Sequence, residues 1–244
     1  MRVAVVMPAY NEAEGIGEFL TELNNSLQDW DSEFFVVNDL STDKTIQALE
    51  NAGESGIPVN VFTNDINLGH GPSTLRALTL GLDSGSDLII AIDGDGQFIG
   101  SDVAQLVALM KDSDTEIIEG VRRQRNDPAY RSIVSSITRN LVWTRAGVKP
   151  TDANTPLRIY RRSALSTILE SLPSNAMTPN LLISAITRRR GLTFAEVDVQ
   201  SIPRRGTEVG GSTWKAKTDF LPSKRFIKFC TGATAQWFTS SIKS

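Results

Sequence analysis

The stretch Ile89-Ile90-Ala91-Ile92-Asp93-Gly94-Asp95-Gly96-Gln97-Phe98 decides the fold. Its apolar half predicts a buried strand, which ends abruptly in two aspartates one residue apart. Alternate residues of a strand share a face, so Asp93 and Asp95 are expected to converge on one point, with Gln97 in reach where the chain turns. Two carboxylates and an amide oxygen suit a magnesium or manganese ion that also holds substrate phosphates. The alternative is an ordinary Asp-Gly turn between strands.

Three earlier stretches share the pattern of this one: a short apolar run, a polar or glycine-rich loop, and then apolar residues at helical spacing. Strand, helix, strand, helix, four times over, predicts a parallel sheet with helices on both faces. In such sheets ligands bind beyond the carboxyl ends of the strands. The loops expected there are residues 8–12, 39–43, 67–71 and 93–97.

Beyond residue 100 the alternation is less regular. The patterns predict further helices and strands, a basic loop over 122–128, and a glycine-rich basic loop over 203–215. The run Arg188-Arg189-Arg190-Gly191 is expected to end a helix, where cations favour the C-terminus. We expect one domain over 1–215, divided into halves 1–120 and 121–215, and a basic amphipathic tail over 216–244.

Composition places the chain among globular proteins, since 40% of its 244 residues are hydrophobic. Cys230 is the one cysteine, so no disulfide within the chain is possible, and a reducing compartment fits. No apolar stretch is long enough for a membrane-spanning helix, and the N-terminus passes straight into a strand pattern without a signal peptide. The expected location is cytoplasmic.

Charge divides the chain into two parts. Residues 1–120 hold 4 Lys and Arg against 21 Asp and Glu, whereas residues 121–244 hold 21 against 7. This asymmetry favours an anionic partner for the second half; the alternative is that the basic and acidic surfaces face one another or solvent. The basic, aromatic tail is typical of a helix in a membrane interface, and equally of one packed on its own domain.

Together, the loops resemble a family 2 glycosyltransferase of the GT-A fold, an α/β fold with a mostly parallel, Rossmann-like sheet. The resemblance rests on Val5-Val6-Met7-Pro8-Ala9-Tyr10-Asn11-Glu12, Val36-Val37-Asn38-Asp39-Leu40-Ser41-Thr42-Asp43, Asn67-Leu68-Gly69-His70-Gly71 and Asp93-Gly94-Asp95-Gly96-Gln97. The Asp-x-Asp-Gly-Gln form is most similar to polyprenyl-phosphate sugar transferases, such as the dolichyl-phosphate mannose synthases. Ile202-Pro203-Arg204-Arg205 with Gly211-Ser212-Thr213-Trp214 resembles a further region of those enzymes.

The resemblance implies roles for individual residues. Asp93, Asp95 and Gln97 would hold a divalent cation against the diphosphate of a GDP- or UDP-sugar, with Asp95, Arg131 and Arg158 as the catalytic set. Arginines are expected to contact phosphates, which the planar guanidinium suits. The implied nucleotide-sugar contacts are Pro8, Tyr10, Glu12, Asp39, Gly69, His70, Asp93, Gly94, Arg122, Arg204 and Arg205.

The acceptor is inferred from a missing base. A sugar hydroxyl normally needs a carboxylate to remove its proton. Between residues 128 and 195 the only acidic residues are Asp152 and Glu170, and Asn180 stands where many relatives have a glutamate. A phosphate acceptor is already an anion and needs no base. The missing base favours a phosphate acceptor, and the resemblance then implies an inverting mannosyl- or glucosyltransferase acting on polyprenyl phosphate, peripherally at the cytosolic face of a membrane.

Two alternatives remain at this point. A family 2 glycosyltransferase acting on a sugar hydroxyl would use Asp152 as its base. A more remote alternative is a non-catalytic scaffold or nucleic-acid-binding protein that uses the basic half. It predicts salt-sensitive binding to RNA or DNA and leaves the four loops unexplained.

Overall fold

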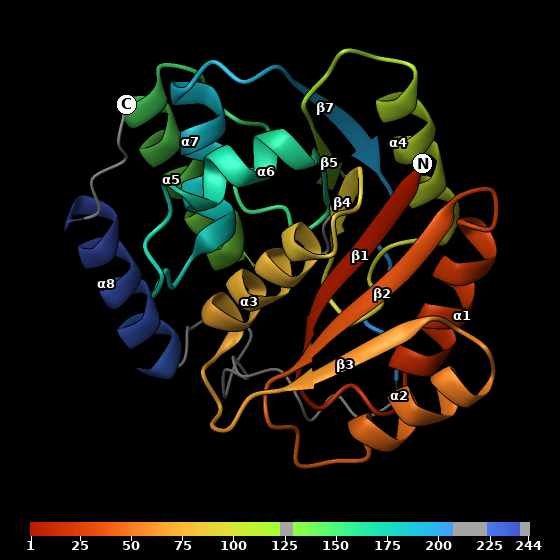
Figure 1. Cartoon of the computed structure of the whole chain (residues 1–244). Helices are drawn as coiled ribbons and strands as arrows, with labels where there is room; N and C mark the ends of the chain where they lie inside the picture. The colour runs from red at the N-terminus through yellow and green to blue at the C-terminus, as the bar shows by residue number, and fades with distance from the viewer. Residues whose placement is uncertain (123–128, 207–223, 240–244) are drawn as a thin grey trace.

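A seven-stranded sheet in the order β3-β2-β1-β4-β6-β5-β7 runs through the centre of the computed structural model (Figure 1). The structure describes residues 1–122, 129–206 and 224–239; the side chains of residues 129–131 and 224–226 are not described. The strands are β1 (Arg2–Ala9), β2 (Asp31–Asn38), β3 (Val59–Thr63), β4 (Leu88–Ala91), β5 (Ile117–Arg122), β6 (Arg158–Arg161) and β7 (Phe194–Val199).

The sheet is mostly parallel, as the sequence predicts. β1 pairs in parallel with β2 on one side and β4 on the other, and β2 pairs in parallel with β3. Only β6 runs against its neighbours β4 and β5 in the described part of the chain. β1 is buried from Val3 to Ala9 because it lies between two strands and under helices on both faces, which is why it is a continuous apolar run.

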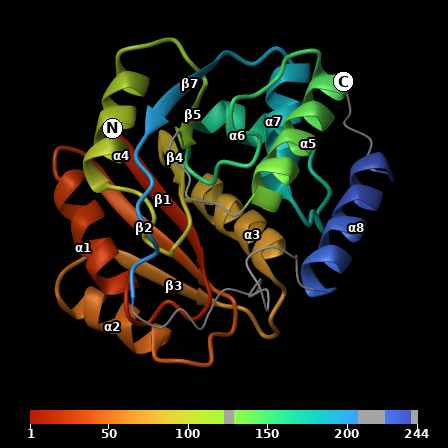
Figure 2. The same ribbon diagram turned by 180° about the vertical axis from the view of Figure 1, so that it is seen from behind.

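Helices cover both faces of the sheet (Figures 1 and 2). Val3, Val5 and Met7 of β1 belong to one core cluster and Ala4 and Val6 to the other, because successive side chains of a strand point to opposite faces. The first cluster packs against α1 (Ile16–Ser26), α2 (Thr45–Glu54) and α4 (Gly100–Lys111). The second packs against α3 (His70–Asp83), α5 (Ala129–Ala146), α6 (Arg162–Leu169) and α7 (Pro179–Arg189).

The last described helix, α8 (Lys224–Thr239), packs on the second group of helices (Figure 2). Trp237 is buried in that core, and the Arg145 guanidinium lies 5.0 Å from the centroid of its ring. Gln236 accepts a hydrogen bond from the Met177 backbone at 2.6 Å. Within the described residues, no helix has the length and apolar character needed to cross a membrane.

The strand ends differ from the sequence prediction near the expected site. β1 continues through Pro8 and Ala9, because these residues pair with Val37 and Asn38 of β2. β4 ends one residue early, at Ala91. The chain moves from β1 to β2 on one side, while β4 lies on the other. The loops after β1 and β4 therefore leave the sheet at the point where the strand order reverses, the usual ligand crevice of an open α/β sheet.

Candidate active site

The loops that follow β1 and β4 touch at the edge of the sheet. The backbone nitrogen of Gly94 donates a hydrogen bond to the Pro8 carbonyl at 3.2 Å. A Cβ atom on residue 94 would lie 2.9 Å from that same oxygen, closer than such atoms approach. Glycine at this position thus lets the two loops meet and places Asp93 and Asp95 beside the end of β1.

Asp93, Asp95 and Glu12 gather negative charge at this junction. Burial, followed by the charges of Asp93 and Glu12, raises the pKa of Asp95 to about 7. Burial is also the main cause that raises the pKa of Glu12, against the opposing effect of Arg204. Carboxylates with raised pKa values at the ends of strands mark this junction as a candidate functional site.

A segment from the far end of the chain holds the aspartate loop in place. The Ile202 nitrogen donates to the Gln97 carbonyl at 3.0 Å, and the Arg205 nitrogen donates to the Asp95 carbonyl at 3.1 Å. Gly96 adopts a φ of 68°, a conformation that favours glycine. The turn that brings Gln97 next to the aspartates is therefore fixed by backbone bonds from residues 202–205.

The two arginines of that segment, Arg204 and Arg205, bind different partners. Arg204 forms a two-point ion pair with Glu12, and 30% of its side chain is exposed at the site. Arg205 instead points toward α1, where it donates hydrogen bonds to Glu18 and Glu22, and it also donates to the Gly96 carbonyl. The structure places the Arg205 guanidinium against two carboxylates, with 12% of the side chain exposed, so contact with a phosphate would require it to leave them.

Asp39 holds the loop between β3 and α3. Its carboxylate accepts hydrogen bonds from Asn64 Nδ2 at 2.7 Å and from the backbone nitrogens of Leu68 and Gly69, both at 2.8 Å. Oδ2 accepts only one of these three, and a carboxylate oxygen has two lone pairs. One acceptor position on Asp39 thus remains for a ligand. Tyr10, the residue directly after β1, is partly buried.

Gly69 and His70 form the start of α3. Gly69 precedes the helix with a φ of 87°, which a side chain would disfavour. His70 is the first helical residue, and its Nε2 lies 3.6 Å from Oδ1 of Asp93. The α3 N-terminus therefore faces the aspartate loop, as the sequence predicts for two loops at one edge of the sheet.

Arg158, which the resemblance places in the catalytic set, is not at the surface of the site in this structure but in a buried cluster. Its side chain is fully buried, with Nε 3.2 Å from Glu119 and Nη2 2.8 Å from the Ser184 hydroxyl. Arg188 completes this cluster, pairing with Glu119 at 2.7 Å and Glu196 at 3.0 Å. Two carboxylates and two arginines thus balance each other, with Glu119, Arg158 and Arg188 buried and Glu196 at the edge of the cluster, where 23% of its side chain is exposed.

Arg122, the last residue of β5, forms an ion pair with Asp152. Arg122 donates to both carboxylate oxygens of Asp152, at 2.8 and 3.2 Å, and also to the Asn154 carbonyl. Both residues are mostly buried. Arg131 belongs to α5, and its side chain lies outside the described residues, as do the basic loop after Arg122 and the Gly211–Trp214 region.

Sequence reasoning missed several residues that shape the site. Asn64 positions Asp39, while Glu119 holds both Arg158 and Arg188. Glu119 carried one usable signal, since a lone carboxylate inside the apolar strand Ile117–Val121 requires a cationic partner. The identity of that partner is set by tertiary structure.

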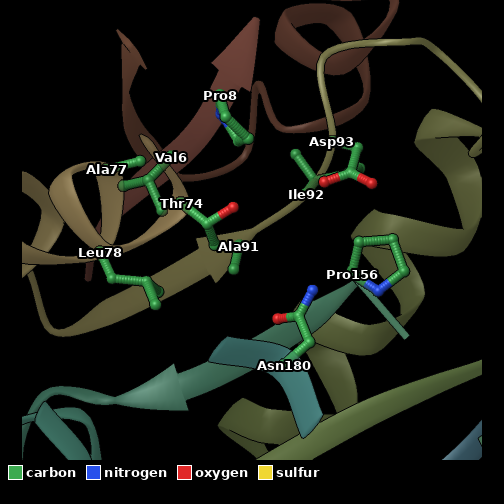
Figure 3. Close-up of a pocket in the computed structure, with 10 residues that line it drawn as sticks. All are labelled: Val6, Pro8, Thr74, Ala77, Leu78, Ala91, Ile92, Asp93, Pro156 and Asn180. Carbon is green, nitrogen blue, oxygen red and sulfur yellow. The ribbon is translucent and has the colours of Figure 1, made fainter. Parts of the chain in front are cut away.

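A small pocket opens between the end of β4 and helices α3 and α7 (Figure 3). Its polar side chains are Asp93, Thr74 and Asn180, and the remaining lining is aliphatic or proline. Asp93 is the one carboxylate among the described residues that line it. The aspartate loop, the α3 N-terminus and α7 thus surround one space.

The family model described as "Glycosyl transferase family 2" matches residues 4–169. Among curated proteins, the undecaprenyl-phosphate 4-deoxy-4-formamido-L-arabinose transferase of Salmonella choleraesuis (strain SC-B67) is 27% identical over 190 residues, covering 77% of this chain. The dodecaprenyl-phosphate galacturonate synthase of Rhizobium johnstonii is 26% identical over 173 residues, or 69% of this chain. The chain spans 57% and 50% of the lengths of these two relatives.

Solved structures show the same fold at lower identity. Glucosyl-3-phosphoglycerate synthase from Mycobacterium tuberculosis, in complex with Mn²⁺, UDP and glucosyl-3-phosphoglycerate, has a TM-score of 0.61 and 20% identity. The match covers 85% of this chain and 73% of that one. Mannosyl-3-phosphoglycerate synthase from Rubrobacter xylanophilus has a TM-score of 0.65 at 16% identity, over 98% of this chain and 74% of that one. The chain has the GT-A fold.

Proposed function

The chain belongs to glycosyl transferase family 2, and from this premise we propose that it transfers a sugar, with inversion, from a nucleotide-sugar to a polyprenyl phosphate. Residues 1–215 form the catalytic domain in this proposal, with a nucleotide-sugar half over 1–120 and an acceptor half over 121–215. The names of both curated relatives, an undecaprenyl-phosphate transferase and a dodecaprenyl-phosphate synthase, support the acceptor class.

The pairing of Asp152 with Arg122 is the observation that carries the proposal. This residue is the base that a sugar-hydroxyl acceptor would require, yet both of its oxygens accept hydrogen bonds from Arg122. Removing a proton from a hydroxyl would first require breaking this two-point pair. A phosphate acceptor reaches the sugar already ionised, so it attacks without a base. The structure therefore favours the phosphate acceptor over the hydroxyl acceptor.

A divalent cation fits the aspartate loop. Among the residues that the structure describes, no three acidic, histidine or cysteine side chains form a complete metal cage. Magnesium-type sites do not need one, since they often combine one or two carboxylates with substrate phosphates. In our proposal Asp93, Asp95 and Gln97 hold Mg²⁺ or Mn²⁺, and the raised pKa of Asp95 fits a group that ionises fully when a cation binds. The ion supplies charge stabilisation for the diphosphate leaving group.

The chain's own residues bind and orient the donor. We assign the nucleotide to Pro8, Tyr10, Asp39 and Gly69, with Asp39 offering its remaining acceptor position to a base N–H. Arg204, partly exposed beside Glu12, is placed to exchange its carboxylate partner for a phosphate. Glu12, His70, Gly94, Arg122 and Arg131 remain proposed donor or phosphate contacts. The names of the relatives do not favour the mannosyl or glucosyl type, nor do they decide between UDP and GDP.

Membrane contact is part of the proposal, at the cytosolic face. Side chains of α5 and α8 leave large apolar groups in the solvent, with Ile133 61% and Phe238 72% exposed. Helices of this kind can lie in the interface of a membrane that carries the polyprenyl phosphate.

The test is transfer of label from nucleotide-sugar to lipid. The purified chain is incubated with UDP- and GDP-linked glucose, mannose and galacturonate, with undecaprenyl or dolichyl phosphate or with oligosaccharides as acceptors, and with Mn²⁺ or Mg²⁺. We expect solvent-extractable labelled lipid from at least one donor, of inverted anomeric configuration, and none in EDTA. If label enters only saccharide hydroxyls, the alternative acceptor holds. Absence of transfer to lipid from every donor contradicts the proposal.

A further inference from the structure

The pocket between β4, α3 and α7 is small, with a volume of about 10 Å³, close to the least that holds one water-sized group (Figure 3). Thr74 donates its hydroxyl hydrogen to the His70 carbonyl at 2.8 Å, so its oxygen can only accept in the pocket. Asp93 also contributes acceptors. The pocket therefore offers two acceptor walls, and its remaining polar wall is Asn180.

The orientation of the Asn180 amide is fixed by Arg158. Asn180 lies in the first turn of α7 and is 4% exposed. Its Oδ1 accepts a hydrogen bond from Arg158 Nη1 at 3.2 Å. A guanidinium has only donors, so a flipped amide would set two donors against each other. The nitrogen must then face the other way, and Figure 3 shows it pointing toward the side of the pocket where Asp93 and Pro156 lie.

Arg158 cannot move to accept a different arrangement. Besides Asn180 it bonds Glu119, Ser184 and the Ala153 carbonyl, all within the buried cluster. Burial disfavours its charge, but the carboxylate of Glu119 outweighs this and raises the pKa of Arg158. Arg158 thus stays a cation and a pure donor, and acts as the positioning residue for Asn180.

The amide nitrogen of Asn180 has no hydrogen-bond partner among the described residues. Because Asn180 lines the pocket, a ligand or water held there can accept a hydrogen bond from this nitrogen. The group that fills this space must accept from Asn180 and donate to a carboxylate or threonine oxygen. A hydroxyl does both, whereas a phosphate oxygen can only accept and would meet the acceptors of Asp93 and Thr74.

We propose that Asn180 donates its side-chain N–H to one hydroxyl of the transferred sugar and is a specificity-determining residue for the nucleotide-sugar donor. The inference rests on the proposed function and adds to it the group that reads the sugar. It gives the buried cluster of Glu119, Arg158 and Arg188 a purpose at the site, since that cluster holds the amide in the donating orientation.

The substitution Asn180→Asp separates this role from a structural one. The aspartate keeps an oxygen toward Arg158, so a purely structural residue would tolerate the change, but the donor into the pocket is lost. Calorimetry in Mn²⁺ compares UDP-glucose, GDP-mannose and UDP-galacturonate with UDP and GDP. For the donor that the wild type binds, we expect binding to weaken at least about tenfold, or about 1.4 kcal/mol, with binding of its nucleoside diphosphate changed less than about twofold.

Two controls keep the result interpretable. Asn51→Asp makes the same chemical change at an exposed position of α2 and should leave all affinities unchanged. Asn180→Ala removes the donor without adding charge, and it should show the same selective loss, including where the aspartate variant fails to fold.

Three outcomes overturn the inference. Equal affinity of wild type and both Asn180 variants for the nucleotide-sugar does so, and so does an equal loss for the sugar-free diphosphate. The same holds if the wild type binds the nucleotide-sugar no more tightly than the diphosphate. Binding of neither ligand by the wild type removes the proposed function as well, which distinguishes the two failures.

Discussion

Two groups of carboxylates in this molecule differ in how their charge is balanced. Glu119 and Glu196 face Arg188, and Glu119 also faces Arg158, so two acids meet two cations, and only Glu196 is partly exposed to water. At the junction of β1 and β4, Asp93, Asp95 and Glu12 face one arginine, Arg204, in the described part of the chain. The first group is complete in itself, whereas the second has an excess of negative charge.

The balanced group around Glu119 stabilises the fold, whereas the excess negative charge at the junction of β1 and β4 suits the binding of a cation. A balanced buried pair is destabilised when either partner is removed, because the other is left alone in a medium of low dielectric constant. An unbalanced cluster behaves in the opposite way, since removing one of its charges relieves repulsion. The same chemical change, carboxylate to amide, should therefore have opposite effects on stability in the two places.

The largest effect is expected for Glu119→Gln. The amide leaves Arg158 and Arg188 with Glu196 as their remaining acid, and breaking a buried pair costs about 3–5 kcal/mol in the free energy of unfolding. For a chain of this size the melting temperature should fall by roughly 10 °C. Denaturant unfolding measures the change, and Glu50→Gln, at an exposed position of α2, is the matched control.

A second variant tests the reason for that loss. Glu119→Gln combined with Arg188→Met removes one charge of each sign and should recover part of the lost stability, because replacing a buried pair by apolar groups is often neutral. A loss below about 1 kcal/mol in the single variant would mean that water reaches the cluster and that the two regions do not differ as described.

The sheet and its site loops were open to prediction from sequence because they depend on local pattern. Each early strand is a continuous apolar run, and parallel topology brings the following loops to one edge without further information. Both the mostly parallel sheet and the helices on its two faces are confirmed. The match between loops and strand ends is what carried the site prediction.

The roles of the arginines were not open to such prediction. Arg158 sits in a strand that alternates as a surface strand would, but its partner Glu119 is 39 positions away, and Arg188 is 69 positions from the same carboxylate. Arg204 and Arg205 meet α1 and its preceding loop across more than 180 residues. Charge counts show that cations are present and not which carboxylates they meet.

An intermediate effect is expected for the pH dependence of the metal-free protein. The pKa of Asp95 is raised from 3.8 to about 7, so the folded state holds this proton more tightly than the unfolded chain. A raised pKa gives stability that is present below the unfolded value and is lost as the pH rises through the folded one. Between pH 5 and pH 8 in EDTA, we expect wild type to lose about 1–3 kcal/mol through this group.

Asp95→Asn should flatten that dependence, and it should abolish lipid transfer while leaving the protein at least as stable as wild type at pH 8. Melting curves at a series of pH values, taken for both proteins in the same buffers, isolate the contribution of Asp95 from other titrating groups. Parallel curves for the two proteins would show that Asp95 is not the source of the pH dependence and would weaken the contrast between the two regions.

The smallest effect on stability is expected for Arg205→Met. Arg205 belongs to a balanced ion-pair group and also contacts the unbalanced aspartate loop. Arg205 is balanced by Glu18 and Glu22, like the buried cluster, but its side chain also bonds Gly96 within the aspartate loop. The ion pairs are partly exposed, so the free energy of unfolding should fall by only about 1 kcal/mol. Transfer should fall further, about tenfold, because a loop that is displaced slightly misplaces the groups it carries.

Arg162→Met, at an exposed position of α6, is the control. Unchanged transfer in Arg205→Met would show that the bonds from the backbone nitrogens of residues 202 and 205, which the variant keeps, suffice to hold Asp95 and Gln97.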